Sequence, residues 1–199
     1  WIAGIYKSVP AIMLVLGGTI VTSVFNALVS LLKYVADTDS QLPAIVYWLM
    51  GSLASVGWNS IWAIIPVGIG LVVLVCCGWR INVLSMGERE ARTLGVDVRS
   101  VKRIVIAGAT LTTAGAVCMC GVVGWVGLVI PHISRMIAGH DNRRLIPVSI
   151  SIGAAFMVII DTVSRSLTAS ELPLSILTSL IGAPFFVLLL KRTKGGGWQ

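Results

Sequence analysis

Long apolar runs separated by short polar connections occupy almost the whole chain. A helix needs ~20 mostly apolar residues to cross the hydrocarbon core of a bilayer, and four runs approach or reach that length. They cover residues 11–32, 61–79, 146–165 and 172–190. The third run reaches it only if Asp161 and Arg165, spaced i,i+4, pair near its end. The pattern predicts an all-α polytopic membrane protein with short loops and no separate soluble domain.

A fifth apolar stretch, residues 104–134, contains no Asp, Glu, Lys or Arg. It is too long for one upright helix and short for two. As one span it divides Lys and Arg almost evenly between the two sides, whereas as two spans it leaves only Lys33 and Arg165 on the outer side. Because cytoplasmic loops carry an excess of Lys and Arg, we expect two spans that turn near Gly121 and Gly124, one of them short, tilted or partly broken. The total is then six spans, with the C-terminus in the cytoplasm.

Residues 42–58 are apolar but interrupted by proline and glycine. Tyr47, Trp48 and Trp58 are of the kind that anchors a protein at the membrane–water interface. Two interpretations stay open. The segment is either a short helix at the outer surface that dips into a cavity, or an ordinary interfacial loop helix.

Composition supports the membrane class. The chain has 199 residues, of which 56% are apolar and 12% charged, and its mean hydropathy is +0.94. A soluble domain of this size could not bury so much apolar surface. The net charge of +7 does not indicate nucleic-acid binding, because the basic residues lie at the ends of the apolar runs and not on one face.

The sequence offers little for catalysis or metal binding. All four cysteines lie within apolar runs, where they are expected to be small buried hydrophobes. A metal relay at Cys118 and Cys120 is disfavoured, because no His or carboxylate lies nearby in the sequence to complete it. No GxxxxGK[ST] phosphate-binding loop occurs. We therefore expect no cofactor, no metal and no catalytic residue, and ATP would have to be hydrolysed by a different chain.

One charged segment interrupts the apolar runs. Six basic and three acidic residues lie between Arg80 and Arg103. Gly87 and Gly95 are placed to bracket a short helix in which Glu88 pairs with Arg92, and a second short helix is expected after Asp97. From these residues alone, a solvated loop is favoured over a docking surface for a soluble partner.

Five segments, in order, resemble the permease subunit of ABC importers for iron-siderophores, haem and cobalamin (the FecCD type). They are YWLMGSL (47–53), MGEREARTLGV (86–96), GWVGLVIPHISR (124–135), DTVSR (161–165) and ELPLSILTSLIGAPFFVLLLKR (171–192). Family members have ten spans, and the resemblance covers only the later ones, from about residue 46. Residue 1 is Trp, and the opening lacks the layout of a signal peptide. We therefore expect residues 1–199 to be a single membrane domain from the C-terminal part of a longer permease. Ser175 departs from the glycine usual in the last motif.

The resemblance implies two docking sites. Residues 80–103 would be the coupling loop gripped by a cytoplasmic ABC ATPase, through Gly87, Glu88, Ala91, Arg92, Leu94 and Gly95. Arg165, with Glu171 beside it, would meet a carboxylate on an extracytoplasmic substrate-binding protein. The alternative for Arg165 is a pair with Asp161 that only ends a helix, and the two are compatible if the guanidinium is shared.

The resemblance also implies a translocation path between this chain and a second permease subunit. Small polar residues are the candidates for its lining: Thr22, Ser23, Asn26, Thr178 and Ser179. For each residue alone, ordinary hydrogen bonding between helices is the favoured interpretation.

The function implied is that of a permease subunit in an ATP-driven importer, in the lipid of a prokaryotic inner membrane. A ferric siderophore is the expected cargo on family frequency alone, with haem, cobalamin and molybdate open. A secondary transporter driven by an ion gradient is the alternative, but it would need intramembrane carboxylates in several spans and only Asp161 is a candidate. A membrane scaffold that transports nothing is a third possibility.

Overall fold

The computed structural model describes residues 11–54, 56–167 and 171–193. The chain divides into two compact units, Trp1–Val46 and Tyr47–Gln199. In the described part of the first unit, α1 (Ala11–Val35) is followed by a turn and the start of α2 (Gln41–Leu49). Asp37 shapes the turn, because its carboxylate accepts hydrogen bonds from the backbone N–H (3.0 Å) and hydroxyl (2.7 Å) of Ser40. These bonds hold the pKa of Asp37 below its ordinary value.

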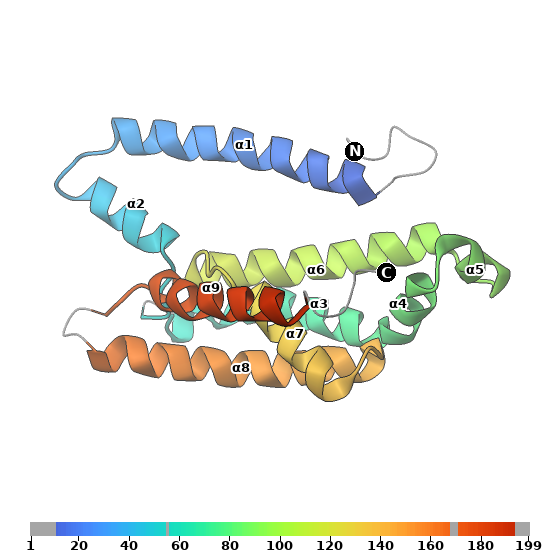
Figure 1. Cartoon of the computed structure of the whole chain (residues 1–199). Helices are drawn as coiled ribbons and strands as arrows, with labels where there is room; N and C mark the ends of the chain where they lie inside the picture. The colour runs from blue at the N-terminus through green and yellow to red at the C-terminus, as the bar shows by residue number, and fades with distance from the viewer. Residues whose placement is uncertain (1–10, 55, 168–170, 194–199) are drawn as a thin grey trace. The chain divides into compact units, whose positions relative to one another are not determined.

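The second unit is a bundle of helices that run alongside one another (Figure 1). Within it, α3 packs along α6, and α7 packs against both α8 and α9. Its elements are the 3₁₀ helix η2 (Trp58–Ala63) and the α-helices α3 (Ile64–Cys76), α4 (Gly78–Ser85), α5 (Glu88–Thr93), α6 (Val98–Cys120), α7 (Val126–Ala138), α8 (Asn142–Leu167) and α9 (Leu174–Thr193).

Small residues let α3 and α6 approach closely. A Cβ added at Gly70 would lie 2.6 Å from the backbone oxygen of Gly108, and one added at Gly115 would lie 2.6 Å from Cγ2 of Val67. Glycine at such positions brings helix backbones together, which is the usual way to pack helices where lipid offers no hydrophobic driving force.

The expected break in residues 104–134 is confirmed. Helix α6 ends at Cys120, and Gly121 has a φ of 72°, a backbone conformation that favours glycine. The next helix, α7, has only 13 residues, as expected for one member of the pair. Helix α8 continues to Leu167, so the expected extension of that run past Ile160 is also confirmed.

The count of six spans is not confirmed. Among the described residues, three helices are long and apolar enough to cross a membrane: Val15–Val35, Val98–Cys120 and Asn142–Leu167. A fourth is possible if Ser60–Cys76 and Gly78–Ser85, which meet at 54°, form one bent span. The helices Val126–Ala138 and Leu174–Leu188 are apolar but shorter. The run at residues 61–79 had no visible break in its hydrophobic pattern, yet its helix bends at Cys77.

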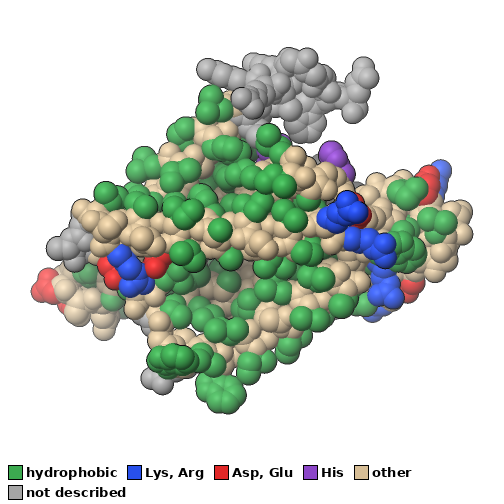
Figure 2. Space-filling view, turned by 90° about the horizontal axis from the view of Figure 1, so that it is seen from below, with side chains coloured by type: hydrophobic (Ala, Val, Ile, Leu, Met, Phe, Trp, Pro, Cys, Tyr) green, Lys and Arg blue, Asp and Glu red, His purple; other side chains and the backbone are tan. Residues whose placement is uncertain are grey.

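Much of the apolar surface is exposed. Large side chains such as Leu16, Val72, Val158 and Leu180 each expose more than half of their area. Figure 2 shows apolar side chains over much of one face, with Lys and Arg gathered toward its ends. Such a surface fits contact with lipid or with other membrane helices.

Candidate functional site

The short helix α5 forms where the sequence predicted it. Gly87 precedes it with a φ of 123°, and Gly95 follows it with a φ of 75°. Both conformations are strained for other residues. The predicted pair of Glu88 and Arg92 is present, with 3.7 Å between Oε2 and Nη2. Glu88 also pairs with Lys102 of α6, a contact 14 residues away that no local pattern indicates.

Packing beneath α5 fixes its position. Ala91 is fully buried and clusters with Val83 of α4 and Val98 of α6, with Leu84 and Val96 packed around them. The side chain of Ala91 is therefore not available to touch a partner, and it acts by seating the helix. The exposed face carries Glu88, Arg92, Leu94 and Gly95. We call the segment from Met86 to Ser100 the α5 site.

The electrostatics of the α5 site are set by its own residues together with Lys102 of α6. The hydrogen bond and the charge of Lys102, then the charge of Arg92, hold the pKa of Glu88 below its ordinary value. One carboxylate thus lies between two cations. The pKa of Asp97 is also lowered, mainly because its carboxylate accepts hydrogen bonds from the hydroxyl and backbone N–H of Ser100.

The expected second short helix after Asp97 is wrong. Asp97 instead caps the N-terminus of the 23-residue helix α6, accepting from the backbone N–H of Arg99 and Ser100. No proline interrupts the sequence after this cap, and the helix continues to the turn at Gly121. The charged segment therefore contains one short helix and the first turns of a long one.

At the opposite end of the second unit, Arg165 is shared between two carboxylates. Its Nε donates to Oδ2 of Asp161 at 2.9 Å, and its Nη1 donates to Oε1 of Glu171 at 3.4 Å. The predicted i,i+4 pair is therefore confirmed, and Glu171 lies beside it as expected. The side chain of Arg165 is still 45% exposed. We call these three residues the Arg165 cluster.

Next to that cluster, three separate segments are joined by backbone hydrogen bonds. The N–H of Leu174 donates to the carbonyl of Gly51 (2.9 Å), and the N–H of Ser52 donates to the carbonyl of Cys120 (3.0 Å). Ser175, the departure from the family motif, donates through its hydroxyl to the carbonyl of Val122 at 2.6 Å. A glycine cannot make this bond, so Ser175 adds a contact between α9 and the turn after α6.

The short helix expected within residues 42–58 is present as Gln41–Leu49, and none of its residues is buried. The backbone at Gly51 and Ser52, just after this helix, is held by the hydrogen bonds to Leu174 and Cys120. The dip into a cavity remains a prediction. Trp58 begins η2 and is 87% exposed.

The candidate path residues lie in different units. In the first unit, Thr22, Ser23 and Asn26 are exposed on α1, and the hydroxyl of Ser23 donates to the carbonyl of Thr19 at 2.9 Å. In the second, Thr178 is only 1% exposed and Ser179 is half-buried. Each group is placed within its own unit, and the shared path remains a prediction.

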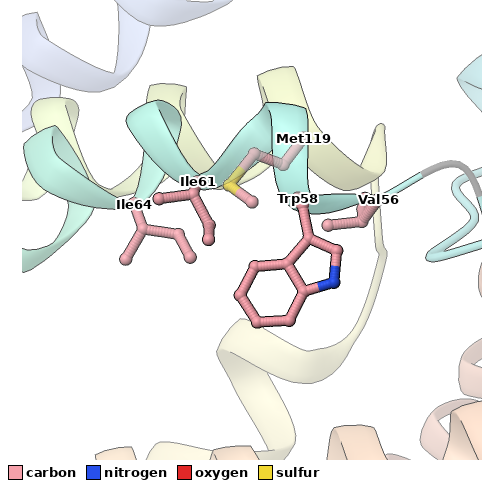
Figure 3. Close-up of a pocket in the computed structure, with 6 residues that line it drawn as sticks. Val56, Trp58, Ile61, Ile64 and Met119 are labelled. Carbon is pink, nitrogen blue, oxygen red and sulfur yellow. The ribbon is translucent and has the colours of Figure 1, made fainter.

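One hollow of about 300 Å³ lies beside η2 (Figure 3). Val56, Trp58, Ile61, Ile64 and Met119 line it, together with Gly57. Apolar side chains dominate this lining, so the hollow has little with which to orient a charged ligand. Over the described ranges, no group of three or more His, Cys, Asp or Glu side chains is placed to hold a metal ion.

Comparison with known proteins gives a consistent result. The family model described as the FecCD transport family matches residues 1–192, so the similarity extends further toward the N-terminus than the motifs indicated. The molybdate import system permease protein MolB of Haemophilus influenzae is 44% identical over 94% of this chain and 56% of its own length. The cobalamin import system permease protein BtuC of Halobacterium salinarum is 44% identical over 92% of this chain and 49% of its own length.

A solved structure has the same fold. It is described as an inward-facing conformation of a metal-chelate type ABC transporter. The match has a TM-score of 0.84 and 43% identity, and it covers 91% of this chain and 59% of that one. The chain thus spans about half the length of the curated relatives it matches.

Proposed function

Because the chain belongs to the FecCD transport family, we propose that it is part of the membrane-embedded permease of an ATP-driven ABC importer. The observation that carries this proposal is the α5 site. A helix of six residues is seated by a buried alanine, bracketed by glycines and charged on its outer face. Such a helix is well suited to receive force from a soluble motor, because a rigid element transmits displacement without deforming.

Residues 80–103 are the proposed coupling loop, facing the cytoplasm together with the C-terminus. The exposed Glu88, Arg92 and Leu94, with the backbone of Gly87 and Gly95, form the surface for the ATPase, while Ala91 positions it. The charged groups favour a partner of mixed charge, and Leu94 supplies an apolar contact that is 58% exposed.

The Arg165 cluster is the proposed contact for an extracytoplasmic substrate-binding protein. The guanidinium of Arg165 already contacts Asp161 and Glu171. A carboxylate of the partner must therefore compete with these two side chains. Glu171 is the weaker of the two contacts by distance, and it is the one expected to yield.

The chain is proposed to supply the later spans of a ten-span permease that pairs with a second permease subunit. Thr22, Ser23, Asn26, Thr178 and Ser179 are proposed for the path, and lipid covers the remaining apolar surface. The cargo class is a metal chelate or a metal oxyanion, because relatives are named for molybdate, cobalamin, hemin and iron hydroxamate. A ferric siderophore remains the specific expectation.

Uptake by the complete importer in proteoliposomes tests this proposal. Labelled ferric siderophore, molybdate and cobalamin are offered separately, each with its binding protein, with ATP or a non-hydrolysable analogue inside. ATP-dependent uptake of one of them is the expected result. Uptake that persists without ATP and stops when an ionophore collapses the ion gradient would instead identify a secondary transporter. Failure of any ATPase to co-purify would favour the scaffold.

A further inference from the structure

The start of α8 is capped by a side chain from another helix. Through Oδ1, Asn82 of α4 accepts hydrogen bonds from the backbone N–H and from Nδ2 of Asn142, both at 2.8 Å. Its own Nδ2 donates to Oδ1 of Asp141 at 2.6 Å. That same oxygen of Asp141 accepts from the backbone N–H of Arg143 at 3.0 Å. Because the first N–H groups of a helix have no partner within it, Asn82 and Asp141 together complete the N-terminus of α8.

Helix α4 also touches α8 through its backbone. A Cβ added at Gly78 would lie 3.2 Å from Cα of Arg143 and 3.4 Å from the carbonyl oxygen of Asn142. Gly78 and Asn82 are four residues apart and so share one face of α4. This face is fixed to the first turn of α8 at two points.

The other side of α4 is fixed to the α5 site. Val83, the residue after Asn82, packs with Ala91 of α5 and Val98 of α6 in the buried cluster already described. Figure 1 shows α4 near α5 at the same end of the second unit as the start of α8. Helix α4 therefore has α5 on one side and α8 on the other.

Helix α8 connects this end to the Arg165 cluster. Its 26 residues correspond to a length of about 39 Å, and it is helical throughout, including at Pro147. Near its far end, the hydroxyl of Ser164 donates to the carbonyl of Leu172 at 2.5 Å, and the buried Ile160 packs with Leu174 of α9. One end of α8 is thus fixed to α4, and the other end carries Asp161 and Arg165 of the Arg165 cluster.

We propose that Asn82 is a positioning residue that couples the α5 site to α8, so that movement of α5 reaches the Arg165 cluster through α8. This inference rests on the proposed importer function. The covalent connection from α5 runs into α6, which ends at Cys120 and carries no residue of the cluster. The link from α4 to α8 is made by side-chain hydrogen bonds and close packing, and it can therefore be broken by substitution without cutting the chain.

The test uses the complete importer, with its ATPase and binding protein, in proteoliposomes. The binding protein is loaded with ferric siderophore, molybdate or cobalamin, whichever the uptake experiment shows to be transported. The measured quantity is the ratio of the ATPase rate with the loaded binding protein to the rate without it. Asn82→Asp puts a second carboxylate at the 2.6 Å contact with Asp141, and like charges at that distance repel. We expect the ratio to fall about fivefold or more, within the usual range of coupling between distant sites. Asn82→Ala removes the contact without adding a charge, and we expect the same fall in the ratio. This variant replaces Asn82→Asp in the test if the importer does not assemble with Asn82→Asp.

The decisive variant exchanges the two groups. In Asn82→Asp with Asp141→Asn, the carboxylate on α4 accepts from Asn142 and from the amide nitrogen at position 141, so the hydrogen bonds between α4 and the start of α8 are remade in reverse. Only the bond from the backbone N–H of Arg143 to position 141, which lies within the start of α8, is lost when that nitrogen faces α4. The ratio should return to near the wild-type value. Asp141→Asn alone is the matched control, because its amide oxygen still accepts from Asn82, and it should keep the wild-type ratio.

Three results would overturn the inference. They are a wild-type ratio in both Asn82→Asp and Asn82→Ala, no recovery in the exchanged variant, or a loss in Asp141→Asn as large as that in Asn82→Asp. A wild-type importer without ATP-driven uptake would contradict the proposed function itself, and the inference would fall with it. An importer that transports normally with Asn82→Ala and keeps its ratio contradicts only the inference.

Discussion

The two ends of the second unit arrange charge in opposite ways. At the α5 site, one carboxylate, Glu88, lies between Arg92 and Lys102. In the Arg165 cluster, one cation lies between Asp161 and Glu171. All of these side chains are at least a fifth exposed, so solvent screens the ion pairs and they add little to folding. The three side chains at the α5 site therefore carry a net positive formal charge. The three side chains of the Arg165 cluster carry a net negative one.

What holds each end in shape is apolar packing and backbone bonding rather than these ions. Ala91 seats α5 against α4 and α6. Ile160, Leu174 and Leu177 form the corresponding cluster where α8 meets α9. Exposed charges can then change partners while the helices beneath them stay in place. The comparison predicts that substitutions beneath a site have larger effects than substitutions on its surface.

Ala91→Arg should give the largest effect. The side chain has no exposed area, so a long cation must either stay buried without a partner or displace α5. We expect a cost of about 3 kcal/mol or more, and ATPase association weakened about 100-fold or more. Co-purification and titration of the ATPase against the complete permease measure this. Thr93→Arg places the same charge on the exposed part of α5 and is the matched control. Equal effects of the two variants would show that α5 is not held by its buried face.

Arg165→Glu should have the next largest effect, at the other end. It leaves three carboxylates together and removes the cation that an acidic partner would contact. Affinity for the binding protein should fall roughly tenfold at low salt, and less at high salt. Glu171→Gln should act in the opposite direction, raising affinity about twofold, because one competitor for the guanidinium is neutralised. Unchanged affinity in Arg165→Glu at low salt would remove the cluster from the docking site.

Ser175→Gly should have a smaller effect, confined to the junction beside the cluster. The variant restores the residue usual in the family and loses the 2.6 Å hydrogen bond to the carbonyl of Val122. A loss of about 1 kcal/mol in stability is expected. Ser175→Ala, which keeps the Cβ but not the hydroxyl, separates this bond from the flexibility of glycine. Faster hydrogen exchange at the amides of Leu174 and Ser175 reports the change. Equal protection in all three proteins would mean that the hydroxyl contributes nothing.

The smallest expected effect is a titration at the α5 site. Because the pKa of Glu88 is lowered in the folded protein, its ionised form favours folding. That contribution is complete above the ordinary value of 4.5 and is lost as the pH falls through the lowered pKa. Lys102→Met removes the main cause, so the pKa of Glu88 should rise toward 4.5. NMR of a protein labelled at glutamate carboxyls follows both curves, and coincident curves would contradict the pairing.

Local features were predictable from the sequence. Gly87 and Gly95 bracket a helix because their conformations suit glycine, and Asp161 reaches Arg165 because residues four apart share a helix face. The break at Gly121 followed from charge balance across a membrane. The family follows from five ordered motifs.

Features that depend on distant residues were not predictable. Lys102 reaches Glu88, and Asn82 reaches Asp141, only because helices far apart in sequence are packed together. The sequence around Asp141 and Asn142 resembles a helix cap, but nothing local identifies Asn82 as its partner. The bend between α3 and α4 was missed because the length of an apolar run does not indicate whether its helix is straight or bent. The burial of Ala91 likewise depends on Val83 of α4 and Val98 of α6 packing against it.

The central claim is that the α5 site faces the inside of the cell and the Arg165 cluster faces the outside. Single reporters Leu94→Cys and Ser166→Cys, both at exposed positions, are introduced after the four native cysteines are replaced. Spheroplasts carrying the complete permease are then treated with a membrane-impermeant maleimide. The account predicts that Ser166→Cys reacts in sealed spheroplasts and that Leu94→Cys reacts only after permeabilisation. Reaction of Leu94→Cys in sealed spheroplasts would contradict it.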